Sequence, residues 1–149
     1  IIGGTRGLGR TLAWYFKDFN FDVTVTGRDE IVGAQVSKDL GIKYSNNNKK
    51  IAQNSDMVII AVPISSTESV IEELAPFMKE GSVMIDVTSV KEGPSYKMKE
   101  CLNEGVEFIP THPVFGPRTT DRRPVYKCQI EIHRGGSFLW VWFAAGIQF

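Results

Sequence analysis

The chain has few cysteines and no excess of charge of either sign. Its 149 residues include two cysteines, Cys101 and Cys128, which form no CxxC pair and have no histidine cluster nearby. This pattern indicates neither a metal site nor a disulfide framework. Lys plus Arg is 17 and Asp plus Glu is 17, with no basic run. We therefore expect no metal cofactor and no nucleic-acid partner.

Membrane and targeting signals are also absent from the sequence. No apolar run reaches the length of about 18 residues that a membrane-spanning helix needs. The most apolar stretch, 138–149, is shorter than that, and no signal peptide is visible. We expect a cytoplasmic protein without a membrane partner. The chain begins at Ile1, inside an apolar run, which favours the interpretation that residues are missing before it.

What the sequence does contain is an alternation of strand and helix patterns in a chain that is 42% hydrophobic, enough for one domain with a core. Ile1-Ile2 is expected to be the end of a first buried strand, and further strands are expected at 22–26, 43–44, 57–62, 82–86 and 106–109. Helices are expected at 8–19, 30–40, 46–54, 67–78 and 95–103. Such alternation predicts an α/β domain of the Rossmann type, with a doubly wound, mainly parallel sheet.

The chemically distinctive residues follow the expected strands directly. They are Gly3–Gly9, Gly27-Arg28, Pro63-Ile64, Thr88-Ser89 and Thr111–Pro113. In a parallel doubly wound sheet the carboxyl ends of all strands lie at one edge, and ligands bind there, where the strand order reverses. Spacing and topology alone therefore place glycines, hydroxyls, an arginine and a histidine along one binding edge.

A glycine-rich loop lies between the first strand and the first helix. It reads Gly4-Thr5-Arg6-Gly7-Leu8-Gly9, where a dinucleotide-binding GxGxxG loop would stand. The helix N-terminus offers free N–H groups to a pyrophosphate, so we expect all six residues to bind the cofactor. Arg6 replaces the middle glycine, and its side chain could itself bind phosphate. The alternative frame Gly3, Gly7, Gly9 matches the spacing of short-chain dehydrogenases, and a tight turn without a ligand is the remaining interpretation.

The end of the second strand bears on the choice between NAD and NADP. Enzymes that use NAD usually place Asp or Glu there to bind the ribose 2′-hydroxyl. Here the strand ends in Thr26-Gly27-Arg28, without a carboxylate. Gly27 and Arg28 are thus expected to bind a 2′-phosphate, which favours NADP, with NAD possible. Asp29 is the competing residue, and its other interpretation is an N-cap of the next helix.

A proline-rich segment holds one of the two histidines. It reads Pro110-Thr111-His112-Pro113-Val114-Phe115-Gly116-Pro117, and proline restricts both itself and the residue before it. Imidazole exchanges protons near neutral pH, as a dehydrogenase that oxidises an alcohol requires. His112 is therefore the candidate general base. The alternative is a histidine that only packs or caps.

At this point the chain resembles a known family. THPVFGP resembles the THPMFGP motif of prephenate and arogenate dehydrogenases, and IIGGTRGLGR, AVPISST and IDVTSVK resemble its archaeal branch. The resemblance covers roughly residues 1–117. It implies NAD(P)-dependent oxidative decarboxylation of prephenate to 4-hydroxyphenylpyruvate, in tyrosine biosynthesis, with His112 at the substrate hydroxyl and Ser89 helping to position that hydroxyl and the nicotinamide. We expect Val62, Pro63 and Thr88, on the same edge, to contact the cofactor.

The chain departs from the family pattern in its last part. The family has a helical second domain that supplies homodimer contacts and an arginine for the substrate carboxylate, and this chain ends before it. We therefore interpret 1–117 as the NADP-binding domain and 118–149 as the end of the domain or a divergent tail, truncated or frame-shifted. Within it, 125–132 could be the next strand, and 138–149 would be an exposed apolar patch.

Three rival interpretations remain from the sequence. A deazaflavin-dependent NADP oxidoreductase shares the GGTxxLG start but gives no reason for THPVFGP. A nucleotide-binding sensor, or a non-catalytic fragment, would bind NADP and turn nothing over. A short-chain dehydrogenase would need a Tyr-x-x-x-Lys pair, but Tyr96 is followed at the fourth position by Glu100.

Overall fold

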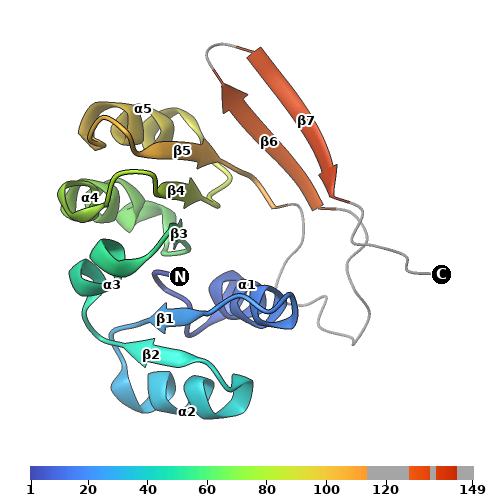
Figure 1. Ribbon diagram of the computed structural model, residues 1–149. Coiled ribbons are helices and arrows are strands. Elements are labelled where there is room, and N and C mark those ends of the chain that lie inside the picture. The colour runs from blue at the N-terminus through green and yellow to red at the C-terminus, as the bar shows by residue number, and fades with distance from the viewer. Residues whose placement is uncertain (114–127, 135–136, 144–149) are drawn as a thin grey trace.

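Strands and helices alternate along the chain (Figure 1) in a computed structural model that describes residues 1–113, 128–134 and 137–143. The first five strands are β1 (Thr24–Thr26), β2 (Lys43–Ser45), β3 (Met57–Ile60), β4 (Val83–Asp86) and β5 (Glu107–Pro110). The helices are α1 (Gly7–Asp18), α2 (Glu30–Leu40), α3 (Asn48–Asn54), α4 (Ile64–Leu74) and α5 (Glu92–Cys101), with a 3₁₀ turn, η1 (Ala75–Phe77).

All pairings among these five strands are parallel, and Ile1-Ile2 joins the two groups that they form. β1 pairs with β2, and β3, β4 and β5 pair in that order. The Ile1 carbonyl accepts from the Thr26 N–H at 2.9 Å, and the Ile2 N–H donates to the Ile59 carbonyl at 2.8 Å. The order is therefore β2, β1, Ile1-Ile2, β3, β4, β5. The chain first winds to one side of Ile1-Ile2 and then to the other, which is the expected Rossmann-type topology.

Both faces of the sheet are buried, each under its own helices. Successive residues of β3 face opposite ways, so Ile59 belongs to one hydrophobic cluster and Ile60 to the other. The first cluster packs α1 and α2 against the sheet through Leu12, Ala13 and Val36. The second packs α3, α4 and α5 through Ala52, Ile71, Leu74 and Met98. This two-sided burial explains why the strands read as continuous apolar runs.

The observed helix boundaries differ from the predicted ones mainly in α3, α4 and α5. α3 begins two residues later than predicted, and α4 ends at Leu74, before the 3₁₀ turn η1. α2 spans the predicted residues, and Gly41 closes it in the left-handed conformation, at φ 62°. α4 begins at Ile64 and α5 at Glu92, each three residues earlier than predicted. In α5 the cause is Pro94, which reads as a helix breaker but lies in the first turn. Proline is tolerated there because its missing N–H would have no helical partner.

The last described elements form a hairpin. β6 (Cys128–Arg134) pairs antiparallel with β7 (Ser137–Phe143), and this pair is a sheet of its own. The strand expected at 125–132 is thus confirmed from Cys128 onward, but it pairs with β7 rather than extending the parallel sheet. Positions 114–127, which include most of the THPVFGP motif, lie outside the described residues.

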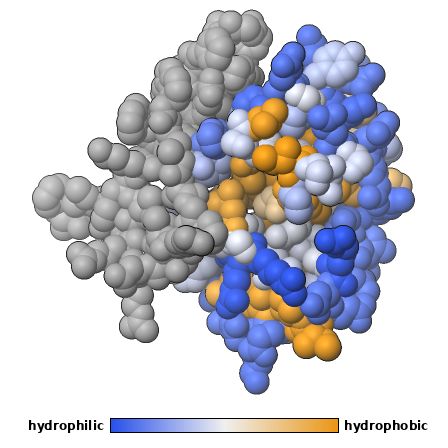
Figure 2. Space-filling view, turned by 180° about the vertical axis from the view of Figure 1, so that it is seen from behind, coloured by the Kyte–Doolittle hydropathy of each residue, from blue (hydrophilic) through white to orange (hydrophobic). Residues whose placement is uncertain are grey.

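The surface of the described part mixes polar and apolar residues. Large hydrophobic side chains with substantial exposure include Trp14, Phe19, Phe21, Ile31, Ile64, Val90 and Tyr96. From behind, hydrophobic residues appear as separate groups among hydrophilic ones (Figure 2). No helix of the described residues is long and apolar enough to cross a membrane.

Candidate functional site

The glycine loop is packed closely between the end of β3 and the start of α1. Gly3 has a φ of 79°, and a Cβ there would lie 2.6 Å from the Ala61 carbonyl oxygen. A Cβ on Gly9 would lie 2.5 Å from the Gly3 carbonyl oxygen. Gly7 differs, because its φ is 52° but a Cβ would meet nothing within 4 Å. A Cβ on Gly4 would lie 2.6 Å from a Val25 methyl carbon. Three glycines of the segment 3–9 thus permit close packing, and the fourth, Gly7, has open space beside it.

The N-terminus of α1 leaves its first N–H groups available to a ligand. Arg6 is the N-cap residue and makes no capping hydrogen bond with its side chain, and the first turn contains no acidic residue. Free N–H groups and the partial positive charge of a helix N-terminus favour an anion. With open space next to Gly7, these residues fit the pyrophosphate of a dinucleotide.

A cavity of about 250 Å³ lies at the point where the strand order reverses. It is lined by Leu8, Ala61, Val62, Pro63, Ile64, Val87, Thr88 and Ser89. These residues come from the start of α1, the segment after β3 and the segment after β4. The structure therefore brings together five of the predicted catalytic or cofactor-binding residues, namely Leu8, Val62, Pro63, Thr88 and Ser89.

Thr88 and Ser89 differ in how free their hydroxyl groups are. Thr88 is 6% exposed, and its hydroxyl donates to the Val90 carbonyl at 2.7 Å. Its N–H donates to an Asp86 carboxylate oxygen at 2.9 Å. These bonds hold the loop in a compact turn, and Ser89 is exposed at its tip. Ser89 is therefore the hydroxyl of this pair that the turn presents to solvent.

The glycine loop and the segment after β1 are joined by an ion pair that sequence reasoning missed. The Arg6 guanidinium lies 2.9 Å from an Asp29 carboxylate oxygen. The other carboxylate oxygen accepts from the Val32 N–H at 3.1 Å, which confirms Asp29 as the N-cap of α2. Arg28 is exposed, and no ion pair or hydrogen bond to it is found among the described residues. Arg28 is therefore the arginine of this region whose charge is not already paired.

Gly27 is held from two sides. A Cβ there would lie 2.5 Å from the Thr5 hydroxyl oxygen, and the Gly27 carbonyl accepts from the Tyr44 hydroxyl at 2.9 Å. Burial raises the pKa of Tyr44, and the carboxylates of Glu30 and Asp29 raise it further. The tyrosine thus stays a neutral donor that fixes the backbone just before Arg28.

His112 and Ser89 lie at the ends of neighbouring strands. Asp86 of β4 pairs in register with Pro110 of β5. Ser89 comes three residues after Asp86, and His112 comes two residues after Pro110. His112 is exposed, whereas Thr111 is 4% exposed. The topology therefore places the two candidate catalytic residues on adjacent segments of the binding edge.

A buried polar cluster under this edge was also missed. The Lys91 ammonium pairs with the Asp86 carboxylate and donates to the Thr111 carbonyl, the latter at 2.6 Å. Both the N–H and the hydroxyl of Thr111 donate to the Asp86 carbonyl, at 2.8 and 2.7 Å. The available signal was a carboxylate ending an apolar strand with a lysine five residues later, because a buried acid needs a cation or several donors.

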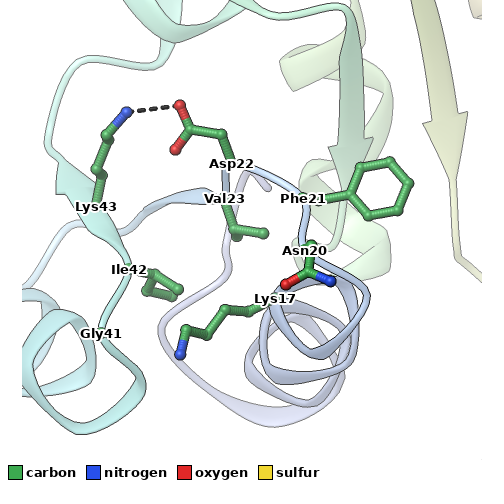
Figure 3. Close-up of a pocket in the computed structure, with 8 residues that line it drawn as sticks. All are labelled: Lys17, Asn20, Phe21, Asp22, Val23, Gly41, Ile42 and Lys43. Atoms are coloured by element: carbon green, nitrogen blue, oxygen red, sulfur yellow. Dashed lines mark hydrogen bonds and ion pairs between the residues drawn. The ribbon is translucent and has the colours of Figure 1, made fainter.

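A larger cavity, of about 500 Å³, lies at the opposite edge of the sheet. Its lining includes Asp22 and Val23, just before β1, and Gly41 and Ile42, just before β2 (Figure 3). It therefore lies at the amino ends of the strands, away from the glycine loop and from His112.

In the described residues no group of three or more His, Cys, Asp or Glu side chains could hold a metal ion.

Comparison with solved structures agrees with this fold. The crystal structure of the prephenate dehydrogenase of Aquifex aeolicus in complex with hydroxyphenyl propionate and NAD⁺ matches with a TM-score of 0.61 at 19% identity. The match covers 72% of this chain and 39% of that one. At this identity the match supports the Rossmann-type fold and nothing finer.

Sequence comparison identifies the family. A probable arogenate/prephenate dehydrogenase of Methanocaldococcus jannaschii is 54% identical over 119 residues, which are 80% of this chain and 27% of the relative. A T-protein of Haemophilus influenzae is 32% identical over 116 residues, 78% of this chain and 26% of the relative. The chain thus spans about a quarter of the length of these two relatives. The family model described as prephenate dehydrogenase, nucleotide-binding domain, matches residues 12–126, and the chain belongs to that family.

Proposed function

We propose that the chain is the cofactor-binding part of an NADP-dependent dehydrogenase that oxidatively decarboxylates prephenate or arogenate. One observation carries this proposal. The cavity at the strand reversal adjoins an uncapped helix N-terminus and Ser89, and His112 ends the neighbouring strand, in a chain of the prephenate dehydrogenase family. The candidate nucleotide site and the two candidate residues for proton transfer thus lie at the same edge of the sheet.

The cofactor would be held by the glycine loop, residues 4–9, and by the walls of the cavity. Pyrophosphate would lie against the N-terminus of α1, and Val62, Pro63 and Thr88 would contact the nicotinamide side. Gly27 and Arg28 would lie beside the adenosine ribose, where the unpaired charge of Arg28 favours a 2′-phosphate and hence NADP over NAD. When bound, the cofactor supplies a hydride acceptor.

The protein residues would handle the proton and the geometry. His112 would accept the proton of the C4 hydroxyl as hydride leaves C4, and Ser89 would orient that hydroxyl by a hydrogen bond. The bond to the ring carboxylate then breaks, its electron pair enters the ring, carbon dioxide leaves, and the proton returns to the phenolic oxygen. Formation of the aromatic ring makes the step irreversible and gives 4-hydroxyphenylpyruvate from prephenate, a precursor of tyrosine.

Family membership favours this reaction over a deazaflavin-dependent oxidoreductase, which we do not propose further. The substrate carboxylate and the contacts of a homodimer would fall to the helical domain that the family resemblance implies. A cytoplasmic location, and the assignment of 118–149 as a divergent tail, stay predictions.

The proposal is tested in a chimera. Residues 1–113 of this chain would replace the matching segment of the Methanocaldococcus jannaschii relative, with which the chain is 54% identical. We expect prephenate-dependent NADPH formation, followed at 340 nm. A matched chimera that carries Ser89→Ala should be slower. A folded chimera that binds NADP but oxidises neither prephenate nor arogenate would contradict the proposal.

A further inference from the structure

Beneath the edge that carries the two catalytic candidates, one cation connects two loops. Asp86, at the end of β4, is fully buried, and its carboxylate pairs with the Lys91 ammonium, whose side chain is 16% exposed. The same ammonium donates to the Thr111 carbonyl at 2.6 Å. Lys91 thus links the loop after β4 to the segment after β5, across the adjacent ends of the two strands.

The Thr111 carbonyl belongs to the peptide unit that contains the His112 nitrogen. Because a peptide unit is planar, a hydrogen bond to that oxygen fixes the orientation of the backbone at which His112 begins. On the other loop, the Asp86 carboxylate accepts from the Thr88 N–H at 2.9 Å, directly before Ser89. A single buried ion pair therefore constrains both catalytic candidates through their preceding residues.

Stability alone does not account for this arrangement. Taking a carboxylate and an ammonium out of water is unfavourable, and well-packed apolar residues of similar volume are often as stabilising as a buried ion pair. What apolar residues cannot supply is a directional bond to the Thr111 carbonyl. The cluster combines four hydrogen bonds that involve backbone groups. The Lys91 ammonium donates to the Thr111 carbonyl, the Thr88 N–H donates to the Asp86 carboxylate, and the N–H and hydroxyl of Thr111 donate to the Asp86 carbonyl.

We propose that Asp86 and Lys91 are positioning residues, which hold the backbone of His112 at a fixed orientation relative to Ser89. The inference rests on the proposed function for the roles of those two side chains. The backbone orientation of His112 is set in the chain without ligand, so it can be measured in the absence of cofactor and substrate.

The test uses nuclear magnetic resonance of the full 149-residue chain, with parent and variants compared at one concentration at which light scattering gives them the same particle size. The double variant Asp86→Asn/Lys91→Met removes both charges, so no unpaired buried charge remains, but it also removes the donor to Thr111. We expect a melting temperature near that of the parent chain, while the backbone order parameter of His112 falls from about 0.85 to below about 0.6. The imidazole signals of His112 should shift as well. Lys91→Arg, which keeps a cationic donor, should largely preserve both readouts.

Lys79→Met is the matched control, because Lys79 pairs with exposed Asp56 at 2.6 Å, away from the binding edge. It should leave the His112 signals unchanged. If the double variant kept His112 rigid, the pair would serve only stability and the proposal would fail. Unfolding of the double variant would likewise assign the pair to the stability of the whole domain and overturn it. Absence of NADP binding or of turnover in the chimera would instead count against the proposed function. The order parameter of His112 could still be interpreted in that case, because it is measured without ligand.

Discussion

At the scale of single residues, the two arginines near the expected ribose position are not equivalent. Arg6 is paired with Asp29 at 2.9 Å, and both side chains are largely exposed. Exposed ion pairs contribute only about 0–1 kcal/mol, so a phosphate could draw Arg6 away from Asp29 at little cost. Arg28 has no such competitor in the described part of the chain. We therefore expect the choice between NADP and NAD to depend mainly on Arg28, and Asp29 to act on it through its ion pair with Arg6.

Replacement of Arg28 should weaken NADP binding selectively. Arg28→Ala is expected to cost about 1–3 kcal/mol for NADP, the range for one charge-assisted contact, and to leave NAD binding nearly unchanged. Isothermal calorimetry of the chain with both cofactors measures this. Lys38→Ala, which removes an exposed cation in the last turn of α2, is the control for a general charge effect. Equal or tighter binding of NAD by the parent chain would exclude the NADP preference.

Neutralising Asp29 should have the opposite effect. Asp29→Asn retains a side-chain oxygen to cap α2, as Asn is a good N-cap, but it releases the Arg6 guanidinium. We expect NADP to bind more tightly, by up to about 1 kcal/mol, with a smaller gain for NAD. Asp39→Asn frees Arg10 in the same way, from an ion pair of 3.0 Å, and serves as the matched control. An equal gain in both variants would show a nonspecific charge effect.

Replacement of His112 should remove proton transfer without affecting the nucleotide site. In the chimera, His112→Asn is expected to lower kcat by about 100- to 10,000-fold, the usual contribution of a general base. The affinity for NADP should barely change, because His112 is not among the residues that line the cavity. Near-normal turnover at neutral pH would show that the histidine is structural.

The sequence located most of the candidate site but not the contacts within it. Leu8, Val62, Pro63 and Ser89 could be predicted because each follows a strand or opens a helix. The ion pair between Arg6 and Asp29 could not, since the side chains are 23 residues apart and either one has a plausible separate role. Long-range pairing of charged side chains depends on how two loops approach, and local patterns contain no information on that distance.

At the scale of elements, apolar patterns predicted the longer helices and strands of the parallel domain, whereas β2 and α3 are short and polar and gave a weaker signal. The strand order needed more, because it depends on backbone bonds to Ile1-Ile2 from both sides. The first turns of α4 and α5 were missed because serine and proline read as loop residues. In a first turn neither disrupts a helix, since the backbone N–H groups there have no helical acceptor.

Two glycines of the loop should respond differently to replacement by alanine. Gly3→Ala combines a φ of 79° with a Cβ 2.6 Å from a carbonyl oxygen, so we expect a loss of stability above the roughly 1–2 kcal/mol of left-handed strain alone. Gly7→Ala should lose about that strain term only, but its methyl group would occupy the open space where a phosphate fits. Thermal unfolding and NADP calorimetry of both variants would test this. An equal loss of stability would contradict the packing argument.

At the scale of the whole molecule, the chain covers only about a quarter of the length of the two relatives compared above, and its described cavity is lined by residues proposed to hold the cofactor. Substrate needs to be held against the cofactor, and such positioning contributes up to roughly 7–11 kcal/mol to catalysis. We therefore expect the 149-residue chain by itself to bind NADP weakly and to oxidise prephenate at no measurable rate. The assay is absorbance at 340 nm, with the chimera as positive control. Robust NADPH formation by the chain alone would place the substrate site within it.

The same preparation should associate in solution. The segment 138–149 contains ten apolar residues in twelve, a composition that drives association wherever such residues face solvent. Light scattering should show species larger than a monomer, and removal of 138–149 should reduce them. A monodisperse monomer of the full chain would show that this segment is covered.

The buried polar cluster at the end of β4 also bears on how the sheet finds its register. In a strand that is apolar on both faces, hydrophobic burial does not favour one register over the next. A slip by one residue exchanges one apolar face for the other, so the buried apolar area stays similar. In β4 that ambiguity ends at Asp86. A slip against β5 would move this carboxylate away from the Lys91 and Thr111 partners on which its burial depends. The cluster thus makes misaligned pairings of β4 and β5 unfavourable relative to the observed register.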